Sequence, residues 1–157
     1  MRCLLFAAFL LAPAVARAEL GINVYGFSYH FERGRARELG FDNQVNPGLG
    51  LRYQRPWRER VDFFVDAGAY RDSGRNTAVV AGAGGLWKAT ARLRLGAALA
   101  VLDSDTYNRG NTAIGPIALA AWEFGPATLN VTFFPKIAEI NEISTLGFWL
   151  TLWPARW

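Results

Sequence analysis

The chain has 157 residues, the length of a single domain, and its 52 % hydrophobic and 19 % charged residues exclude an intrinsically disordered protein. One cysteine (Cys3) and one histidine (His30) are too few for a Cys/His metal site, so no metal ion is expected. Aromatic residues at 14 % and 16 glycines favour strands and tight turns over helices.

The first 18 residues have the three parts of a secretory signal peptide. Arg2 supplies the positive charge, residues 4–15 are apolar, and Ala16-Arg17-Ala18 fits an A-x-A cleavage site. The apolar run is shorter than the roughly 20 residues of a membrane-spanning helix, although an uncleaved anchor helix is the alternative. We therefore predict a signal peptide over 1–18 and one domain over 19–157. Without Arg2 and Arg17 the domain has 15 basic residues against 13 acidic ones, which argues against a nucleic-acid partner.

Eight segments separated by turn signals follow, with the length and spacing of strands in a transmembrane β-barrel. They cover residues 20–31, 47–54, 60–71, 76–87, 91–102, 113–122, 127–134 and 143–153. The predicted fold is all-β: an eight-stranded antiparallel barrel of the outer-membrane type, closed so that no backbone edge meets lipid.

Alternation of side chains supports the barrel. In residues 93–101 the odd positions are bulky or apolar, whereas the even positions are Arg94, Gly96, Ala98 and Ala100. Segments 60–71 and 143–153 alternate in the same way. A soluble β-sandwich would also alternate, but its outer face would be rich in charge, and residues 77–87 and 95–102 contain no charged side chain.

The lengths of the connections assign the two rims of the barrel. Short turns are predicted at 55–59, 88–90 and 123–126, and long connections at 32–46, 103–112 and 135–142, with a short polar turn at 72–75. Outer-membrane barrels keep short turns on the periplasmic side, so the loops after the first, third, fifth and seventh strands should face outward. Five tryptophans near strand ends are expected at the membrane interfaces: Trp57, Trp87, Trp122, Trp149 and Trp153.

Small side chains dominate the face predicted to point inward. They are Asn76, Ala78, Val80, Gly82 and Gly84 in the fourth segment, Gly96, Ala98 and Ala100 in the fifth, and Pro116, Ala118 and Ala120 in the sixth. Two interpretations stay open. The small residues either leave a dry slot for a hydrocarbon chain or only let the strands coil tightly.

The candidate catalytic residues are His30, Asp72 and Ser73, because the topology places all three on the outer rim. A His, an Asp and a Ser can perform acyl transfer, with imidazole as base, carboxylate as orienter and hydroxyl as nucleophile or hydrogen-bond donor. The first and third strands are two steps apart, so the loop ends should be roughly 10 Å apart. Incidental turn residues are the alternative, since Asp103-Ser104 is a second such pair on the same rim.

Four stretches, YGFSYHFER, FDNQVNPGLGLRYQ, DAGAYRDSGRNTAVVAGAGGLW and FGPATLNVTFFP, resemble the lipid A palmitoyltransferases of Gram-negative outer membranes, the PagP type. The resemblance implies an eight-stranded barrel with His30, Asp72 and Ser73 as catalytic residues. It also implies that Gly84 floors an internal acyl slot, with Gly82 on the same strand face.

The resemblance further implies acyl transfer from a phospholipid donor to lipid A in the bacterial outer membrane, by a monomer that uses no cofactor. Arg33 and Arg35 of the first outer loop, together with Arg37, could bind lipopolysaccharide phosphates or form only a solvated loop. Two other functions stay open: a non-catalytic small barrel for envelope integrity or adhesion, and a soluble periplasmic lipid-binding barrel with its bulky faces turned inward.

Overall fold

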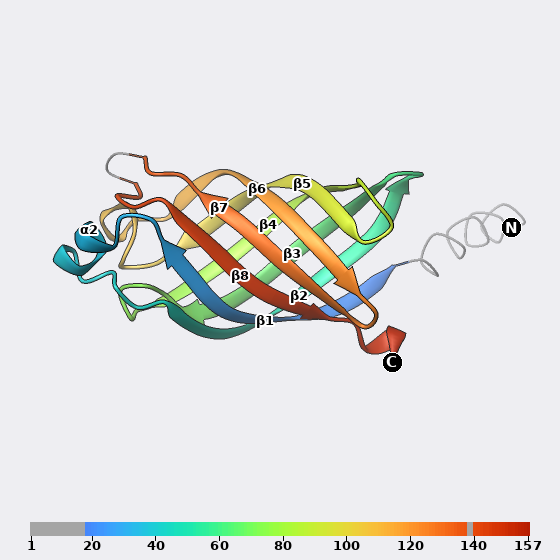
Figure 1. The fold of residues 1–157 in the computed structure, drawn as a ribbon, viewed down its shortest axis with the longest axis horizontal. Coiled ribbons are helices and arrows are strands. Elements are labelled where there is room, and N and C mark those ends of the chain that lie inside the picture. The colour runs from blue at the N-terminus through green and yellow to red at the C-terminus, as the bar shows by residue number, and fades with distance from the viewer. Residues whose placement is uncertain (1–17, 138–139) are drawn as a thin grey trace, which may run out of the picture.

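The computed structural model describes residues 18–137 and 140–157, and within them eight antiparallel strands form one closed barrel in sequence order (Figure 1). The all-β fold and the closed eight-stranded barrel are thereby confirmed. The predicted signal peptide lies outside the described residues, apart from Ala18. The strands are β1 (Glu19–His30), β2 (Val45–Arg58), β3 (Val61–Arg71), β4 (Thr77–Lys88), β5 (Leu93–Asp103), β6 (Ala113–Phe124), β7 (Ala127–Phe134) and β8 (Thr145–Leu152).

The connections at the two ends of the barrel differ in length. One end, here called the loop end, has the long connections after β1, β5 and β7 and the polar turn after β3 (Figure 1). The other, the terminal end, has the short hairpin turns and the C-terminus. The connection after β1 contains a short helix, α2 (Arg33–Glu38), which the sequence did not predict. Two 3-10 turns complete the elements, η1 (Asn108–Gly110) and η2 (Pro154–Arg156). Among the described residues no helix is long and apolar enough to cross a membrane.

The turn predicted at 55–59 was wrong. β2 continues to Arg58, and the chain reverses at Glu59 and Arg60. Pro56 suggested a turn because it lacks a backbone donor. It is accommodated near the strand end, where the pairing with β3 shifts between Pro56 and Arg58. A shift of register is one of the few places at which a sheet tolerates proline.

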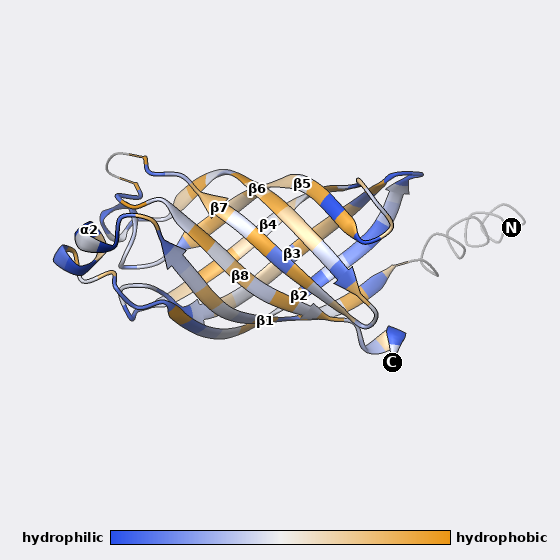
Figure 2. Ribbon diagram, viewed as in Figure 1, coloured by the Kyte–Doolittle hydropathy of each residue, from blue (hydrophilic) through white to orange (hydrophobic). Residues whose placement is uncertain are grey.

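Large apolar side chains cover the outside of the barrel wall. Leu49, Leu99 and Ile114 are 65 %, 61 % and 68 % exposed, and they alternate with small or buried neighbours. In Figure 2 the hydrophobic residues lie along the strands and the hydrophilic ones gather toward both ends. This arrangement is the reverse of that required by a soluble lipid-binding barrel, whose bulky faces would point inward.

The inward face predicted for the sixth strand was also wrong. Ile117, Leu119 and Ala121 are the inward residues of β6, whereas Pro116, Ala118 and Ala120 lie on the outer face. Nearly every residue of this strand is apolar or small, so its sequence does not distinguish the two faces. Pairing of Ala98 with Ile117 sets the phase, because directly paired residues share one face of a sheet.

The tryptophans divide into two groups. Trp57, Trp87 and Trp122 are exposed near strand ends, as predicted. Trp149 and Trp153 are instead 9 % and 1 % exposed and point into the barrel, so their prediction as interfacial residues was wrong. Trp153 Nε1 donates a hydrogen bond of 2.9 Å to Thr128 Oγ1, which gives the buried indole its polar partner.

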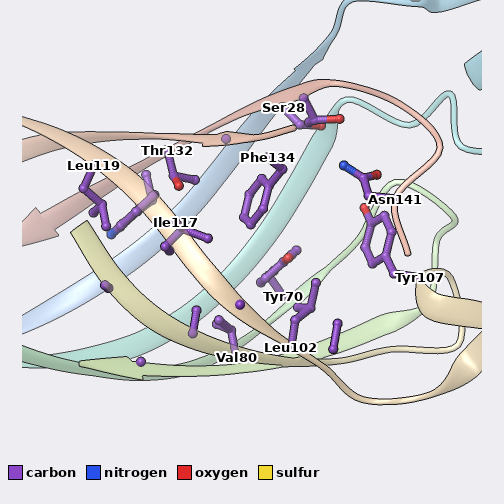
Figure 3. Close-up of a pocket in the computed structure, with 18 of the residues that line it drawn as sticks. Ser28, Tyr70, Val80, Leu102, Tyr107, Ile117, Leu119, Thr132, Phe134 and Asn141 are labelled. Carbon is purple, nitrogen blue, oxygen red and sulfur yellow. The ribbon is translucent and has the colours of Figure 1, made fainter. Parts of the chain in front are cut away.

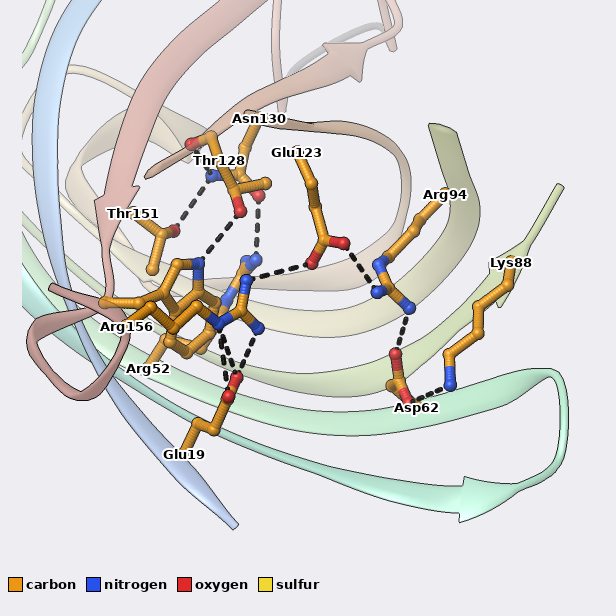
Figure 4. Close-up of polar contacts among 11 residues, drawn as sticks. Glu19, Arg52, Asp62, Lys88, Arg94, Glu123, Thr128, Asn130, Thr151 and Arg156 are labelled. Carbon is orange, nitrogen blue, oxygen red and sulfur yellow. Dashed lines mark hydrogen bonds and ion pairs between the residues drawn. The ribbon is translucent and has the colours of Figure 1, made fainter. Parts of the chain in front are cut away.

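A polar network fills the middle of the barrel on its terminal side (Figure 4). The fully buried Arg52 guanidinium donates to both carboxylate oxygens of Asp66 at 2.8 and 2.6 Å and to Asn130 Oδ1 at 2.7 Å. Asn130 Nδ2 in turn donates to Thr151 Oγ1 at 2.9 Å, and Thr151 donates to Asn23 Oδ1 at 2.7 Å. The rings of Phe64 and Trp149 lie 4.6 and 5.9 Å from the guanidinium carbon. The buried charge is therefore paired and enclosed.

A chain of ion pairs links several strands at the terminal end of the barrel (Figure 4). It runs from Glu19 of β1 through Arg156 of η2 and Glu123 of β6 to Arg94 of β5. Arg94 then pairs with Asp62 of β3, which also accepts from Lys88 of β4 at 3.2 Å. Through Arg156 the C-terminal segment is fixed to the first strand.

Replacing Arg52 tests the buried network. Arg52→Ala leaves the Asp66 carboxylate without its charged partner and with only the Asn23 amide as a donor, and we expect the free energy of unfolding to fall by about 3 to 5 kcal/mol. The matched control is Arg55→Ala, which removes an exposed arginine of the same strand. Urea unfolding in detergent micelles measures both variants. Equal stability of the two would show that the network does not hold the barrel together.

Candidate active site

His30 and Ser73 meet at the loop end of the barrel. His30 is the last residue of β1 and Ser73 lies in the turn after β3, and each is only 2 % exposed. His30 Nε2 and Ser73 Oγ are 2.9 Å apart, a hydrogen bond. An imidazole in contact with a hydroxyl is one of the pairs that can perform acyl transfer, with the imidazole as base.

His30 and Ser73 meet although the ends of β1 and β3 were expected to be roughly 10 Å apart, and the place where β2 starts explains why. β2, which separates β1 from β3, begins at Val45, level with Phe27. His30 therefore lies beyond the start of β2, and no strand stands between its imidazole and Ser73.

Asp72 is fully buried but serves the turn rather than the imidazole. Its Oδ1 accepts hydrogen bonds from the backbone N–H groups of Gly74 and Asn76 at 3.0 and 2.9 Å. Its Oδ2 accepts from the Ser104 hydroxyl. Among the described residues, His30 Nδ1 has no hydrogen-bond partner. Asp72 thus shapes the turn that carries Ser73, and the expected carboxylate–imidazole contact is not formed.

Sequence reasoning missed two residues of this site, Ser104 and Tyr107. Ser104 is 6 % exposed and bonds Asp72; its only signal was its place on the same rim, next to Asp103. The Tyr107 phenol lies beside Ser73, and burial raises the pKa of this phenol. The site is therefore assembled from the end of β1 and from the connections after β3 and β5.

An apolar cavity of about 330 Å³ occupies the loop-end half of the barrel, and Ser73 is one of its lining residues. Figure 3 shows Ser28 and Tyr107 at one end of it and Leu119 at the other. Much of the wall is small or apolar, including Val80, Ala98 and Ala100. Ser28 Oγ and Asn46 Oδ1, both from lining residues, are buried and have no hydrogen-bond partner in the described part of the chain. The cavity is thus mostly apolar, although Asp66 and Thr132 also line it.

The cavity also reaches the side of the barrel between β6 and β7. Pairing of these strands starts at Ala118 with Phe133, so residues 113–117 of β6 pair with β5 alone. Pro116 and Pro135 line the cavity at this interruption, and neither has a backbone N–H to donate. A molecule outside the barrel wall could pass here without breaking a hydrogen bond between β6 and β7.

Gly82 and Gly84, both predicted to bind substrate, have different roles. Gly82 lines the cavity, and a Cβ atom there would lie 3.1 Å from the Leu99 carbonyl oxygen. Gly84 is not a lining residue, and a Cβ atom there would overlap the Ala97 carbonyl oxygen. The slot interpretation therefore fits Gly82, and the close-coiling interpretation fits Gly84. The floor of the cavity is made by larger side chains such as Phe64 and Leu119.

Arg33 and Arg35 lie on α2, outside the cavity lining. Arg35 donates to Glu142 at 2.5 Å and to Glu38 at 3.3 Å, which ties α2 to the connection after β7. The Arg33 guanidinium carbon lies 5.0 Å from the centre of the Tyr29 ring. Both arginines are exposed on the rim rather than beside Ser73. Within the described residues, no group of His, Cys, Asp and Glu side chains could hold a metal ion.

Comparison with known proteins adds no relative: no family model matches the chain, and no curated protein matches it. The resemblance to lipid A palmitoyltransferases therefore stays a prediction from the four sequence stretches.

Removing the Asp72 carboxylate tests its place in the turn. Asp72→Ala leaves two backbone N–H groups and the Ser104 hydroxyl without their acceptor, and we expect it to lower the free energy of unfolding by about 1 to 3 kcal/mol. Asp103→Ala is the control, because Asp103 is exposed and accepts from Thr112. Denaturant unfolding in micelles compares them. A control variant as unstable as Asp72→Ala would contradict this role.

Proposed function

We propose that the protein is an outer-membrane acyltransferase that moves a fatty acyl chain from a glycerophospholipid to lipid A. The observation that carries the proposal is the His30–Ser73 pair at the mouth of an apolar cavity inside a closed barrel. A reactive pair beside a slot with apolar walls suits a substrate with a long hydrocarbon chain and one polar, reacting end.

The outer surface supports a location in a membrane. Large apolar side chains face outward along the strands, and exposed tryptophans lie near the strand ends. Closure of the barrel pairs most of the backbone groups that hydrocarbon would leave unsatisfied, apart from the side of residues 113–117 that faces β7. These features, together with the signal peptide predicted over 1–18, favour the bacterial outer membrane.

The proposed reaction needs a base, which is His30, and an attacking hydroxyl, which lipid A supplies. A lipid A hydroxyl attacks the ester carbon of the phospholipid, and His30 takes the proton of this hydroxyl. The ester bond to glycerol breaks as the new ester bond forms, and the proton passes to the glycerol oxygen of the leaving lysophospholipid. Ser73, which contacts both His30 and the cavity, lies where the ester would be held.

The two substrates would reach Ser73 by different routes. The donor chain would enter the cavity from the side, through the interruption between β6 and β7. Lipid A would approach from the rim, where the exposed Arg33 and Arg37 can bind its phosphates. Arg35 contributes less to binding, since Glu38 and Glu142 already pair with it.

Loss of the reactive pair should abolish transfer without unfolding the barrel. We expect His30→Ala and Ser73→Ala to add no acyl chain to lipid A in cells, as measured by mass spectrometry of extracted lipid A. Ser144→Ala is the control, because this hydroxyl lies at the same end of the barrel and accepts from the Lys136 backbone. Heat-modifiable migration on gels verifies folding.

Two outcomes would count against the proposal. Transfer at the unmutated rate in both variants would remove His30 and Ser73 from the chemistry. Lipid A of the same composition with and without the wild-type protein would instead favour a non-catalytic barrel.

The two glycines of β4 should respond differently to an added methyl group. Gly82→Ala narrows the cavity, and we expect the accepted acyl chain to become shorter while the barrel stays stable. Gly84→Ala forces β4 away from the Ala97 carbonyl, so it should lower stability and leave chain length unchanged. Mass spectrometry of lipid A gives the chain length, and unfolding in micelles gives stability. The reverse pattern would place the floor of the slot at Gly84.

A further inference from the structure

We infer that Ser104 is a positioning residue of the proposed transferase, acting on Ser73 through Asp72. This inference rests on the proposed function and assigns a role to a residue that does not itself line the cavity. Ser104 directly follows β5, is 6 % exposed, and donates its hydroxyl hydrogen to Asp72 Oδ2.

The position of the Asp72 carboxylate sets the position of Ser73. Asp72 Oδ1 holds the backbone N–H groups of Gly74 and Asn76, and Ser73 lies inside the loop that these bonds close. A carboxylate held at one oxygen only could rotate about its terminal bond, whose energy wells are broad. The Ser104 bond to the second oxygen removes this freedom. The 2.9 Å contact between Ser73 and His30 therefore depends on a side chain from another connection.

Ser104 also joins the turn after β3 to the connection after β5. Its Oγ accepts a 3.0 Å hydrogen bond from the Thr106 backbone N–H while donating to Asp72. Thr106 Oγ1 accepts from Asn76 Nδ2 at 3.1 Å, so the two segments are linked twice. The turn leads into β4, whose pairing with β5 ends at Val79 with Asp103. Beyond this pair, the two side-chain hydrogen bonds continue the link between the turn and the connection after β5.

The same connection offers a matched control in Thr112. Its hydroxyl also donates to a carboxylate, that of Asp103 at 2.7 Å, but both residues are exposed and neither contacts Asp72 or Ser73. A hydroxyl–carboxylate bond is thus present twice in residues 103–112, once buried at the site and once on the surface.

The experiment measures acyl transfer by the full-length purified protein in mixed micelles of phospholipid and lipid A. The variants are Ser104→Ala, Ser104→Thr, Thr112→Ala, and Asp72→Asn alone and combined with Ser104→Ala. We expect Ser104→Ala to lower kcat at least about ten-fold, as the loss of one hydrogen bond to a charged group implies, with KM for phospholipid unchanged. Ser104→Thr keeps the hydroxyl and should keep most of the rate, and Thr112→Ala should equal the wild type.

Two readouts separate positioning from a general loss of structure. If Ser104 acts through Asp72, the combined loss in the double variant is smaller than the product of the two single losses. Amide hydrogen exchange at Gly74 and Asn76 should accelerate in Ser104→Ala but not in Thr112→Ala. The thermal transition of the barrel should fall less in Ser104→Ala than in Asp72→Ala, because Ser104→Ala removes only one of the three hydrogen bonds of the Asp72 carboxylate.

The possible results bear on the two proposals separately. An inactive wild-type protein would overturn the proposed function, and the amide exchange would still test the Ser104 contact. An active wild type with Ser104→Ala at the same rate, or with multiplicative losses in the double variant, would overturn the role of Ser104. Unchanged exchange at Gly74 and Asn76 would overturn it as well.

Discussion

The interior of this barrel is narrow, and the side chains that point into it determine where the barrel is filled and where a cavity remains. An eight-stranded barrel leaves room for little more than one layer of side chains. On the terminal side the chain fills this space with a paired charge, Arg52 with Asp66, and with the side chains that bind them. On the loop side it places small residues and leaves a cavity of about 330 Å³. A filled terminal half and an open loop-end half thus come from one repeating strand pattern.

The reactive pair occupies the mouth of that cavity because of strand lengths. β1 extends past the start of β2, so His30 lies above the neighbouring strand and reaches Ser73 across it. The connections around the pair are joined by backbone hydrogen bonds, such as that from Asn43 N–H to the Ser73 carbonyl oxygen, and by contacts between side chains. The Asp42–Arg75 pair at 3.0 Å, which holds the pKa of Asp42 below its usual value, joins the first connection to the second. Ser104 joins the second to the third.

The Asp72 carboxylate has a different role here from the carboxylate of a Ser-His-Asp triad. In a Ser-His-Asp triad the carboxylate accepts from the imidazole and fixes its tautomer. Here both carboxylate oxygens are taken by the turn and by Ser104, and His30 Nδ1 has no partner among the described residues. The carboxylate controls the hydroxyl of the pair instead of the imidazole. Residue identity on the rim pointed to the site, but it did not give the connectivity of its hydrogen bonds.

Strand number, the all-β class and the grouping of His30, Asp72 and Ser73 on one rim could be predicted from sequence, because alternation and turn residues are local signals. Which face of residues 113–122 points inward could not be predicted, because both faces of that strand are apolar and only its pairing with β5 distinguishes them. Helix α2 is tied to the connection after β7 by the Arg35–Glu142 pair, a contact between segments far apart in the chain. The Ser104–Asp72 bond likewise joins residues on either side of β4, and the inward orientation of Trp149 depends on barrel closure. Contacts between distant segments arise only when the barrel closes, so the tertiary structure alone decides them.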